Sequence, residues 1–503
     1  MELHSFTVYD VFRRNAALFG KRPAVVFEER EITFQELLTM ADRAAGWLAR
    51  SGIKKGDRVA VLSKNCPEFL ILAGAIAASG AIMVPINFRL SVEEIGYNIE
   101  NTKPVAVFVD SDYQEMMHGV KAKFPGVKTW MSMGPAGEGF APFSALLAGS
   151  PAKAADVNGN DPFVIIHTAA VQGKPRGAVL SHANMIYGGL QSMAAIGLSS
   201  GDIYLNILPL FHIGGLIAAF TIMHAGGVNL IVPKYDPVEC GKLIDVKQVT
   251  MIGDFPPILA QLLDARDAGH CTLASLKNVY GLERPETITR FEDLGTGNFW
   301  MIYGQTETMG ITCLAKNADK PGSAGRPGLL SDIMIGDEFD RPVETGKPGE
   351  ILIRGPLVFL GYWGEEELTA LTFREGWHHT GDLGRLDEDG FLWFAGRKAE
   401  KELIKPGGEN VYPIEVEKVV LEHPDVLEVS VIGVPDPKFG EGIKAVCVLK
   451  PGVKLTKQEL IVFVAARIAR YKKPNYVEFV ETLPKKEDGS IDRVKVKELY
   501  GQG

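Results

Sequence analysis

The residues that could do chemistry gather in four short segments, and the first is a turn that carries two cations. In 163–182 the apolar run FVIIHT leads to Gly173, Lys174 and Arg176, and a helical pattern begins at Ser181. Backbone N–H groups and cations in such a turn suit phosphate groups, although the spacing is not that of a P-loop. A plain link between a strand and a helix is the alternative.

The second segment, YGQTET (303–308), follows an apolar strand pattern. Polar side chains at the end of a buried strand lie where open α/β sheets bind their ligands. Thr306 beside Glu307 suits a phosphate group with its Mg²⁺. A polar surface loop is the alternative.

The third segment, WHHTGD (377–382), and the fourth, KPGGENVYP (405–413), are turn-like. Asp382 in a tight turn could bind a ribose diol or cap the turn. The two histidines before it would point to opposite faces of an extended chain, so they would rarely chelate one ion. Gly407 and Gly408 let a ligand or another chain approach the backbone closely, with a flexible connector as the alternative.

The elements that must position these segments follow from the pattern of the chain. In the first half short β-branched runs alternate with helical patterns, which predicts βαβ units and parallel sheets. After Gly325 short strands with turns indicate a small β-rich module. A charged stretch at 396–402, expected to be solvated, marks a boundary, and helices and strands follow it.

Composition excludes several classes of protein. The 503 residues exceed one compact domain, and 46 % hydrophobic with 23 % charged residues is the balance of a folded chain. A net charge of −9 argues against nucleic acid as a partner. Five scattered cysteines predict neither a disulfide framework nor a zinc knuckle, and they favour a reducing compartment, the cytoplasm.

We expect neither a signal peptide nor a membrane span. The N-terminal residues lack a basic region followed by an apolar one. The apolar stretch 70–86 is short and interrupted, so it predicts a buried helix that leads into a buried strand.

Charge is divided unevenly along the chain. From Gly396 onward the net charge is +2, and the preceding part carries −11. A mildly basic unit that faces an acidic one could collect a phosphate-bearing ligand between them. Ordinary compositional scatter explains the difference equally well.

Together the four segments resemble the AMP-forming acyl-CoA synthetases, which belong to the adenylate-forming enzymes. The resemblance covers nearly the whole chain, and further matching segments occur in the family's order at 209–215 (PLFHIGG), 249–259, 322–327, 355–363, 431–440 and 483–485. It implies an α/β fold with a large N-terminal domain (1–396) of two parallel-type α/β sheets plus a small β-rich module. A hinge (397–402) and a small mobile α+β C-terminal domain (403–503) would follow.

The resemblance also implies roles for residues around ATP. The loop from Thr168 to Gly177 would wrap the β- and γ-phosphates. Thr306 would bind the α-phosphate and Glu307 the Mg²⁺. Asp382 would hold the ribose hydroxyls with help from Arg397. The remaining nucleotide-side positions are Gln172, Gly173, Lys174 and Arg176 in the loop, Gly281, Leu282 and Glu283 at a strand end on the adenine side, and Tyr303, stacked on adenine, with Gly304 and Gln305.

A second set of roles concerns the acid and coenzyme A. His212 and the glycines after it would line the acyl pocket, Glu402 would lie at the hinge, and Lys405, Gly407, Gly408 and Glu409 would border the pantetheine tunnel. In the family, ATP activates a carboxylate as acyl-AMP, and the CoA thiol then displaces AMP after the small domain rotates. The expected catalytic residues are Thr306, Glu307, His212, Arg176 and Lys174.

Three departures from the family pattern stand out. The phosphate loop carries Ala169, Ala170 and Val171 where hydroxyls or glycine are usual, and Arg176 replaces a lysine. Near the C-terminus Ser490 occupies the position of the lysine that approaches the α-phosphate and the carboxylate during adenylation. The hinge carries a two-residue insertion between Arg397 and Lys405.

Two functions therefore stay open. One is an acyl-CoA ligase for a hydrophobic acid, whether medium-chain, alicyclic or aromatic. The other is a relative that has lost adenylation and binds acyl-CoA or a nucleotide, which Ser490 would favour. Lys485, Lys486 or Lys495 could replace the missing cation. A carrier protein as acyl acceptor is a minor alternative, and the oligomeric state, a homodimer included, is not readable from the sequence.

Overall fold

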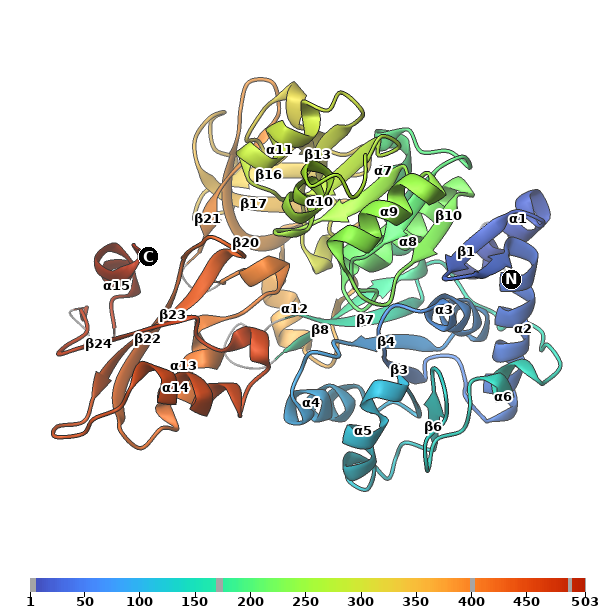
Figure 1. The fold of residues 1–503 in the computed structure, drawn as a ribbon, viewed down its shortest axis with the longest axis horizontal. Coiled ribbons are helices and arrows are strands. Elements are labelled where there is room, and N and C mark those ends of the chain that lie inside the picture. The colour runs from blue at the N-terminus through green and yellow to red at the C-terminus, as the bar shows by residue number, and fades with distance from the viewer. Residues whose placement is uncertain (1–5, 169–174, 399–402, 487–490, 503) are drawn as a thin grey trace.

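The computed structural model of the chain describes residues 6–168, 175–398, 403–486 and 491–502. Its centre contains two large mixed sheets with helices between them (Figure 1). The nine-stranded sheet has the order β15 (Arg326–Pro327), β14 (Cys313–Lys316), β13 (Asn298–Tyr303), β12 (Asn278–Gly281), β11 (Met251–Asp254), β9 (Ile203–Asn206), β10 (Val228–Ile231), β1 (Pro23–Phe27) and β2 (Arg30–Thr33). Strands β13 to β1 in this order are parallel, and the remaining pairs are antiparallel.

The second sheet has seven strands and a parallel centre. Its order is β18 (Gly361–Tyr362), β8 (Arg176–Ser181), β7 (Pro162–Thr168), β4 (Ile82–Ile86), β3 (Arg58–Leu62), β5 (Ala106–Val109) and β6 (Thr129–Ser132). The pairs β18–β8 and β8–β7 are antiparallel. The stretch 70–86 folds as predicted, into the end of a buried helix and strand β4.

Helices fill the space between the sheets and cover their outer faces. The inner layer is α1 (Val8–Phe19), α2 (Phe34–Arg50), α3 (Pro67–Ser79), α7 (His182–Ile196) and α8 (Ile213–Ala225), of which α3 and α8 are buried on nearly every side. The outer face of the nine-stranded sheet packs against α9 (Pro237–Lys247), α10 (Ile258–Asp267) and α11 (Pro285–Glu292). The outer face of the seven-stranded sheet packs against α4 (Val92–Thr102) and α5 (Gln114–Lys121), and α6 (Ser144–Leu147) contacts α2.

The β-rich module is a five-stranded antiparallel sheet. It consists of β16 (Asp332–Gly336), β17 (Gly349–Arg354), β19 (Phe373–Arg374), β20 (Trp377–Leu386) and β21 (Leu392–Arg397), with α12 (Glu366–Thr372) beside it.

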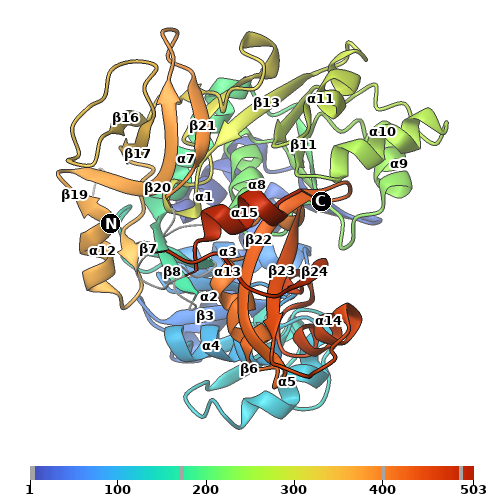
Figure 2. The same cartoon turned by 90° about the vertical axis from the view of Figure 1, so that its left-hand side faces the viewer.

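The C-terminal domain has two cores of its own, one on each face of a three-stranded sheet. The sheet consists of β22 (Val426–Asp436), β23 (Gly440–Leu449) and β24 (Tyr476–Val480). Helices α13 (Pro413–Leu421) and α14 (Lys457–Ala465) cover one face, and α15 (Arg493–Tyr500) covers the other. Figure 2 shows these elements in front of the large domain. The boundaries at 396 and 403 and the hinge between them stay a prediction.

One local prediction was wrong and two were incomplete. The helix begins where it was predicted, since Ser181 caps α7, but the prediction missed β8 (176–181), an antiparallel partner of β7. Asp382 lies inside strand β20 rather than in a tight turn. In the charged stretch 396–402, Arg397 and Lys398 pair with the buried carboxylates of Asp382 and Glu350, although the Lys398 side chain is still 39 % exposed, and residues 399–402 fall outside the described residues.

Other expectations concern the whole chain. All five cysteines are free. No helix among the described residues is both long and apolar enough to cross a membrane.

Candidate active site

Three parallel strands end side by side at one edge of the nine-stranded sheet. Asp254, Gly281 and Tyr303 are the last residues of β11, β12 and β13. Gly304 follows, and a Cβ there would lie 2.3 Å from the backbone of Gly310, so only glycine permits this close packing. The chain then turns into a short 3₁₀ helix, Thr306–Thr308, which is buried. The second predicted segment is therefore a fixed turn at the sheet edge.

Asp382 is the centre of a buried hydrogen-bond network. Its Oδ2 accepts from the Tyr303 hydroxyl at 2.9 Å and from Gln305 Nε2 at 2.8 Å. Its Oδ1 lies 3.0 Å from Arg397 Nε. Burial and the nearby Asp382 carboxylate raise the pKa of Tyr303 well above its usual value, so the hydroxyl stays protonated and donates. The structure thus brings together four residues that the sequence assigned to the nucleotide.

Glu350 supports this network from β17. Its Oε1 accepts the Gly381 N–H at 2.8 Å, and its Oε2 accepts from Lys398 at 2.7 Å. Burial raises the pKa of Glu350, but hydrogen bonds from His379, Lys398 and the Gly381 N–H outweigh it and bring the pKa to about 2. A permanently ionised carboxylate therefore fixes the backbone next to Asp382.

Glu307 lies in the same turn and is 8 % exposed. Its Oε1 accepts from the Tyr362 hydroxyl at 2.8 Å, and the guanidinium of Arg176 lies 5.7 Å from the Tyr362 ring centre. Within the described residues Oε2 of Glu307 has no hydrogen-bond partner, and no three potential ligands from His, Cys, Asp or Glu cluster around an ion. One carboxylate with a free oxygen fits Mg²⁺, which is commonly held by one or two carboxylates and by substrate phosphates.

His212 caps the helix that borders the site. Its Nδ1 accepts the Gly214 N–H at 3.2 Å at the start of α8. Burial, with help from the nearby Lys405 and Arg89 cations, lowers the pKa of His212 to about 4, so the ring is neutral near pH 7.

An apolar pocket lies between the inner helices and the nine-stranded sheet. It is lined by side chains from α7, α8 and four strands or loops: Ser192, Ile196, Ile217, Ala218, Thr221, Met251, Tyr280, Ile311 and Leu314. Its lining residue Ile311 follows Gly310 in the chain, and a Cβ on Gly310 would lie 3.5 Å from Ile213. The pocket therefore lies beside the turn 304–310 and has a free volume of about 10 Å³. Within the part of the chain that the structure describes, its lining residues do not include His212 or the glycines after it, which the sequence assigned to the acyl pocket.

The segment 405–409 of the small domain packs onto the same edge. A Cβ on Gly408, whose φ is +85°, would lie 3.0 Å from the Phe255 ring, just beyond the end of β11. Glu409 pairs with Arg89 and lies 3.4 Å from the Asn87 amide nitrogen. Gly407 adopts φ +58° within a 3₁₀ turn, so this segment is an ordered structure and not a loose connector.

Lys405 brings a half-buried cation toward the site. Burial and the nearby Arg397 lower the pKa of Lys405, Asp382 and Glu441 oppose them, and the resulting pKa is about 8. The same ammonium group contributes to the lowered pKa of His212. Lys405 thus lies close enough to both Asp382 and His212 to influence their electrostatics.

A second polar contact joins the two domains. Lys472, 3 % exposed, donates to Glu94 of α4 at 2.6 Å and to Glu415 of α13 at 2.8 Å. The C-terminal lysines lie elsewhere. Lys485 pairs with Glu428, and Lys495 lies 3.5 Å from Asp492, all within the small domain.

Some predicted residues are not joined to this cluster. Thr168 is the last residue of β7, and its hydroxyl makes a long hydrogen bond of 3.4 Å to the Arg176 carbonyl. Leu282 and Glu283 follow β12, where the Leu282 N–H donates to the Asp254 carbonyl. The predictions for Gln172, Gly173, Lys174, Glu402 and Ser490, and for Ala169, Ala170 and Val171, fall outside the described residues.

Sequence reasoning missed several participants. Tyr362 lies in the matching segment 355–363 but was given no role, and Glu350 and Arg89 carry no local motif that separates them from ordinary surface or core residues. Asp254 had a signal, since a carboxylate is unusual in an apolar strand. Burial and the neighbouring Glu283 raise its pKa well above the usual value.

Comparisons with known proteins agree with this geometry. The sequence profile of the AMP-binding enzyme family matches residues 12–363, and that of the AMP-binding enzyme C-terminal domain matches 415–490. An indoleacetate–CoA ligase from Aromatoleum aromaticum is 33 % identical, over 97 % of each chain. An amide bond synthetase from Marinactinospora thermotolerans has a TM-score of 0.87 at 25 % identity, covering 98 % of this chain and 100 % of that chain.

A third relative is known in two states. The o-succinylbenzoate CoA synthetase from Bacillus subtilis is 28 % identical to this chain. As a double mutant bound with its product analogue OSB-NCoA it gives a TM-score of 0.85, covering 97 % of this chain and 98 % of that chain. In complex with the acyl-adenylate intermediate OSB-AMP it gives 0.71, covering 98 % and 99 %. The chain belongs to the AMP-binding enzyme family, and it is an AMP-forming acid–thiol ligase.

Proposed function

We propose that this enzyme activates a hydrophobic carboxylic acid as acyl-AMP and transfers the acyl group to coenzyme A. The observation that carries the proposal is the meeting of two sets of residues at one sheet edge. The large domain supplies Tyr303, Glu307 and Asp382, and the small domain supplies Lys405 and Gly408.

In the first step the protein must align the carboxylate with the α-phosphate and neutralise charge there. Tyr303 stacks on adenine, Asp382 with Arg397 holds the ribose, and Thr306 binds the α-phosphate. The Tyr362 side chain lies between Arg176 and Glu307, since its ring contacts the Arg176 guanidinium and its hydroxyl donates to Glu307. The Arg176 guanidinium binds the departing phosphates through two parallel hydrogen bonds. Mg²⁺ held by Glu307 would supply further charge neutralisation on the phosphates.

In the second step the thiol displaces AMP at the same carbonyl. Gly408 leaves room beside Phe255 for pantetheine, since any side chain there would contact the ring. Lys405 is largely protonated below pH 8 and stabilises the phosphate of departing AMP. His212 is neutral, so it does not compete with Lys405 for that charge.

The domain arrangement supports the second step. The TM-score is 0.85 against the relative that holds a CoA product analogue and 0.71 against the same relative with its acyl-adenylate. Segment 405–409 contacts the large domain, whereas Lys485 pairs inside the small domain. We infer that this is the thioester-forming arrangement.

The apolar pocket beside the turn 304–310, which we assign to the start of the acyl group, favours a hydrophobic acid. Its walls are mainly Ile217, Ala218, Met251 and Leu314, with the Tyr280 ring at one side. Two relatives act on aromatic acids, indoleacetate and o-succinylbenzoate. Aromatic and medium-chain acids are therefore the first to test.

A second candidate function follows from Ser490. The family lysine is absent there, and neither Lys485 nor Lys495 is near the site in this arrangement. A relative that binds acyl-CoA or a nucleotide without adenylating would have this pattern. One similar structure is an amide bond synthetase, so an amine is an alternative to CoA as the acyl acceptor.

Separate assays of the two half-reactions test the proposal. Pyrophosphate release is measured with a panel of aromatic and medium-chain acids, and acyl-CoA is measured by mass spectrometry with CoA or an amine as acceptor. Pyrophosphate release together with acyl-CoA supports the ligase. Binding of acyl-CoA without pyrophosphate release from any acid would favour the second candidate, and amide without thioester would replace CoA as acceptor.

A further inference from the structure

A contact between the two domains is built around one buried lysine of the small domain. Lys472 lies in the 3₁₀ turn Arg470–Lys472, and its side chain is 3 % exposed. Its Nζ donates to Oε1 of Glu94 in α4 of the large domain at 2.6 Å. The same Nζ donates to Oε2 of Glu415 in α13 of the small domain at 2.8 Å. One ammonium group therefore bridges carboxylates of both domains.

The two carboxylates occupy matching places in their helices. Glu94 is the third residue of α4, and its Oε2 accepts the Ser91 N–H at 2.8 Å. Glu415 is the third residue of α13, and its Oε1 accepts the Tyr412 N–H at 2.9 Å. Each carboxylate thus caps its own helix with one oxygen and binds Lys472 with the other. Helix N-termini carry partial positive charge, so the two carboxylates allow two of them to meet at one cation.

The lysine stays charged in this position. Burial lowers the pKa of Lys472, but Glu415 and Glu94 outweigh burial and raise the pKa above its usual value. Removing one member of a buried cluster of charges is costly, because the remaining charges lose their partner. The cluster therefore favours the one relative position of α4 and α13 in which all three charges meet.

This contact lies close to the segment that reaches the active site. Burial raises the pKa of the Glu409 carboxylate, and the Arg89 and Lys472 cations both oppose that effect. Helix α13 begins shortly after Glu409. A contact that fixes α13 against α4 therefore also fixes segment 405–409 at the sheet edge, where Gly408 packs against the large domain.

The contact can open without leaving a buried charge unpaired. If α4 and α13 separate, Lys472 keeps Glu415 within the small domain. Glu94 keeps its bond to the Ser91 N–H, and water reaches its other oxygen. Opening therefore costs one ion pair and strands no charge in a core. A contact of this kind can form and break in every catalytic cycle.

We propose that Lys472 is a positioning residue for the thioester step. Its bond to Glu94 holds the small domain against α4, so that segment 405–409 stays at the catalytic edge while the thiol attacks. The inference rests on the proposed function, since it requires two steps with two arrangements of the domains. The bond is open in the other arrangement, so adenylation does not depend on it.

Single-turnover assays of the two half-reactions test this role. Glu94→Gln keeps an oxygen for the Ser91 N–H and removes only the charge that faces Lys472. Thioester formation from supplied acyl-adenylate should fall about tenfold, the effect of one charge-assisted hydrogen bond, and adenylation should stay within about twofold. Lys472→Met should lower thioester formation by about 10²-fold, because it leaves two carboxylates facing each other. Glu415→Gln leaves the bond between the domains in place, so it should cost the thioester step less than Glu94→Gln.

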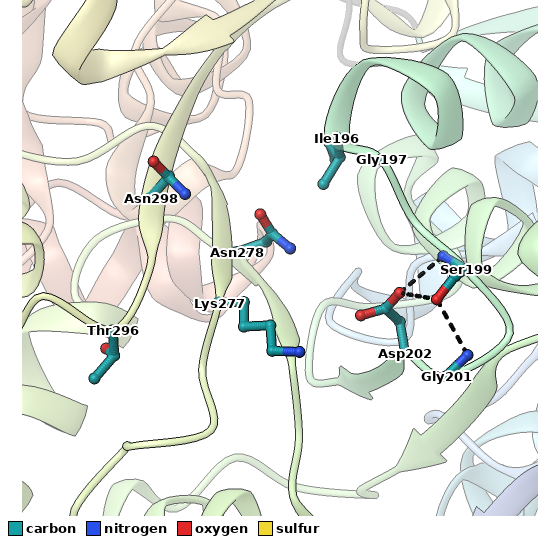
Figure 3. A pocket seen from close by; sticks show the side chains of 9 residues that line it. All are labelled: Ile196, Gly197, Ser199, Gly201, Asp202, Lys277, Asn278, Thr296 and Asn298. Atoms are coloured by element: carbon teal, nitrogen blue, oxygen red, sulfur yellow. Dashed lines mark hydrogen bonds between the residues drawn. The ribbon is translucent and has the colours of Figure 1, made fainter.

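Three exposed residues provide matched controls. Glu100→Gln removes a carboxylate from the same helix as Glu94, and Lys450→Met removes a lysine from the small domain. Lys277→Met removes a lysine of the large domain that lines a hollow of about 570 Å³ between the start of β12 and the end of α7 (Figure 3). All three variants should keep the wild-type rates of both half-reactions.

The outcomes separate a positioning role from a structural one. Equal loss of both half-reactions in Glu94→Gln would overturn the inference, because it would show that the contact only stabilises the fold. Unchanged thioester formation in Glu94→Gln, or a larger loss in Glu415→Gln, would also overturn it. Glu94→Gln decides alone if Lys472→Met does not fold.

A failure of the proposed function is recognised separately. If the wild type forms neither acyl-AMP nor thioester from any acid, the proposed function is wrong, and solution X-ray scattering then tests the contact alone. The scattering curve of Glu94→Gln should differ from that of the wild type, because the small domain is no longer held against α4, while Glu100→Gln should match the wild type. Identical curves for the wild type and Glu94→Gln would overturn the inference.

Discussion

The small domain carries two lysine-bearing segments, and they have opposite surroundings. Segment 405–409 packs against Phe255 and pairs with Arg89 of the large domain, and its Lys405 is half-buried and within the electrostatic reach of Asp382 and Arg397. The segment that contains Lys485 pairs with Glu428 on the small domain itself and is about half exposed. One arrangement of the domains can therefore bring only one of these cations to the acyl–phosphate bond of the adenylate. An enzyme with two steps then needs two arrangements, or one cation that serves both.

The largest expected effect breaks the packing of segment 405–409. Gly408→Leu should leave acyl-AMP formation within about threefold and lower acyl-CoA formation by about 10³-fold or more, an effect of about 4 kcal/mol, because a side chain at 408 would contact the Phe255 ring. Single-turnover assays of each half-reaction measure this. Gly452→Leu is the matched control, because Gly452 has φ +80° with open space around it. Equal loss of both half-reactions in Gly408→Leu would make the segment structural.

A smaller effect is expected at the large-domain side, which both steps share. Glu307→Gln should raise the requirement for Mg²⁺–ATP and lower adenylation by about 10²-fold, close to 3 kcal/mol, because one charge is lost beside the phosphates. Activity is measured over a Mg²⁺ titration. Glu344→Gln, an exposed change, is the control. Unchanged kinetics in Glu307→Gln would remove this carboxylate from the site.

This comparison also shows what the sequence could predict. The strand-end turn 303–308 was predictable because apolar strands and the polar residues after them are local patterns. Strand β8 was missed because its run GAVLS is short and joins a turn, and its pairing with β7 is a non-local choice. Asp382 was assigned to a turn because Thr-Gly precedes it, but it lies within β20 and pairs with Arg397 of β21, beside an irregularity in the pairing of β20 with β17. The Lys472 contacts with Glu94 and Glu415 join residues far apart in the chain, so no spacing rule could find them.

The third prediction concerns the cation missing at Ser490. A hydroxyl donates a hydrogen bond but cannot neutralise charge. If no neighbour replaces the lysine, adenylation is the slow step, and Ser490→Lys should speed it by about tenfold or more with little change in thioester formation from supplied acyl-adenylate. Pyrophosphorolysis of the adenylate should speed up by the same factor.

The competing outcome is equally specific. If a neighbour acts instead, the wild type adenylates fast, Ser490→Lys is neutral, and Lys485→Ala, Lys486→Ala or Lys495→Ala is the damaging change. Fast adenylation in the wild type that none of these changes slows would place the catalytic cation outside the C-terminal segment. Lys405 would then be the candidate for both steps.

The smallest expected effect is a pH dependence of the thioester step. Burial and the nearby Arg397 lower the pKa of Lys405 to about 8. Lys405 therefore carries its charge below pH 8 and loses it as the pH rises. Thioester formation from supplied acyl-adenylate should fall about twofold between pH 7 and pH 8 and about tenfold by pH 9, as one protonated group titrates.

The CoA thiol ionises over the same range and works in the opposite direction, so the rate is corrected for the thiolate fraction. Lys405→Arg should keep the cation and flatten the profile, while Lys405→Met should be slow at every pH. A profile in Lys405→Arg that still falls above pH 8 would show that another group titrates, and segment 405–409 would then supply shape to the site without charge.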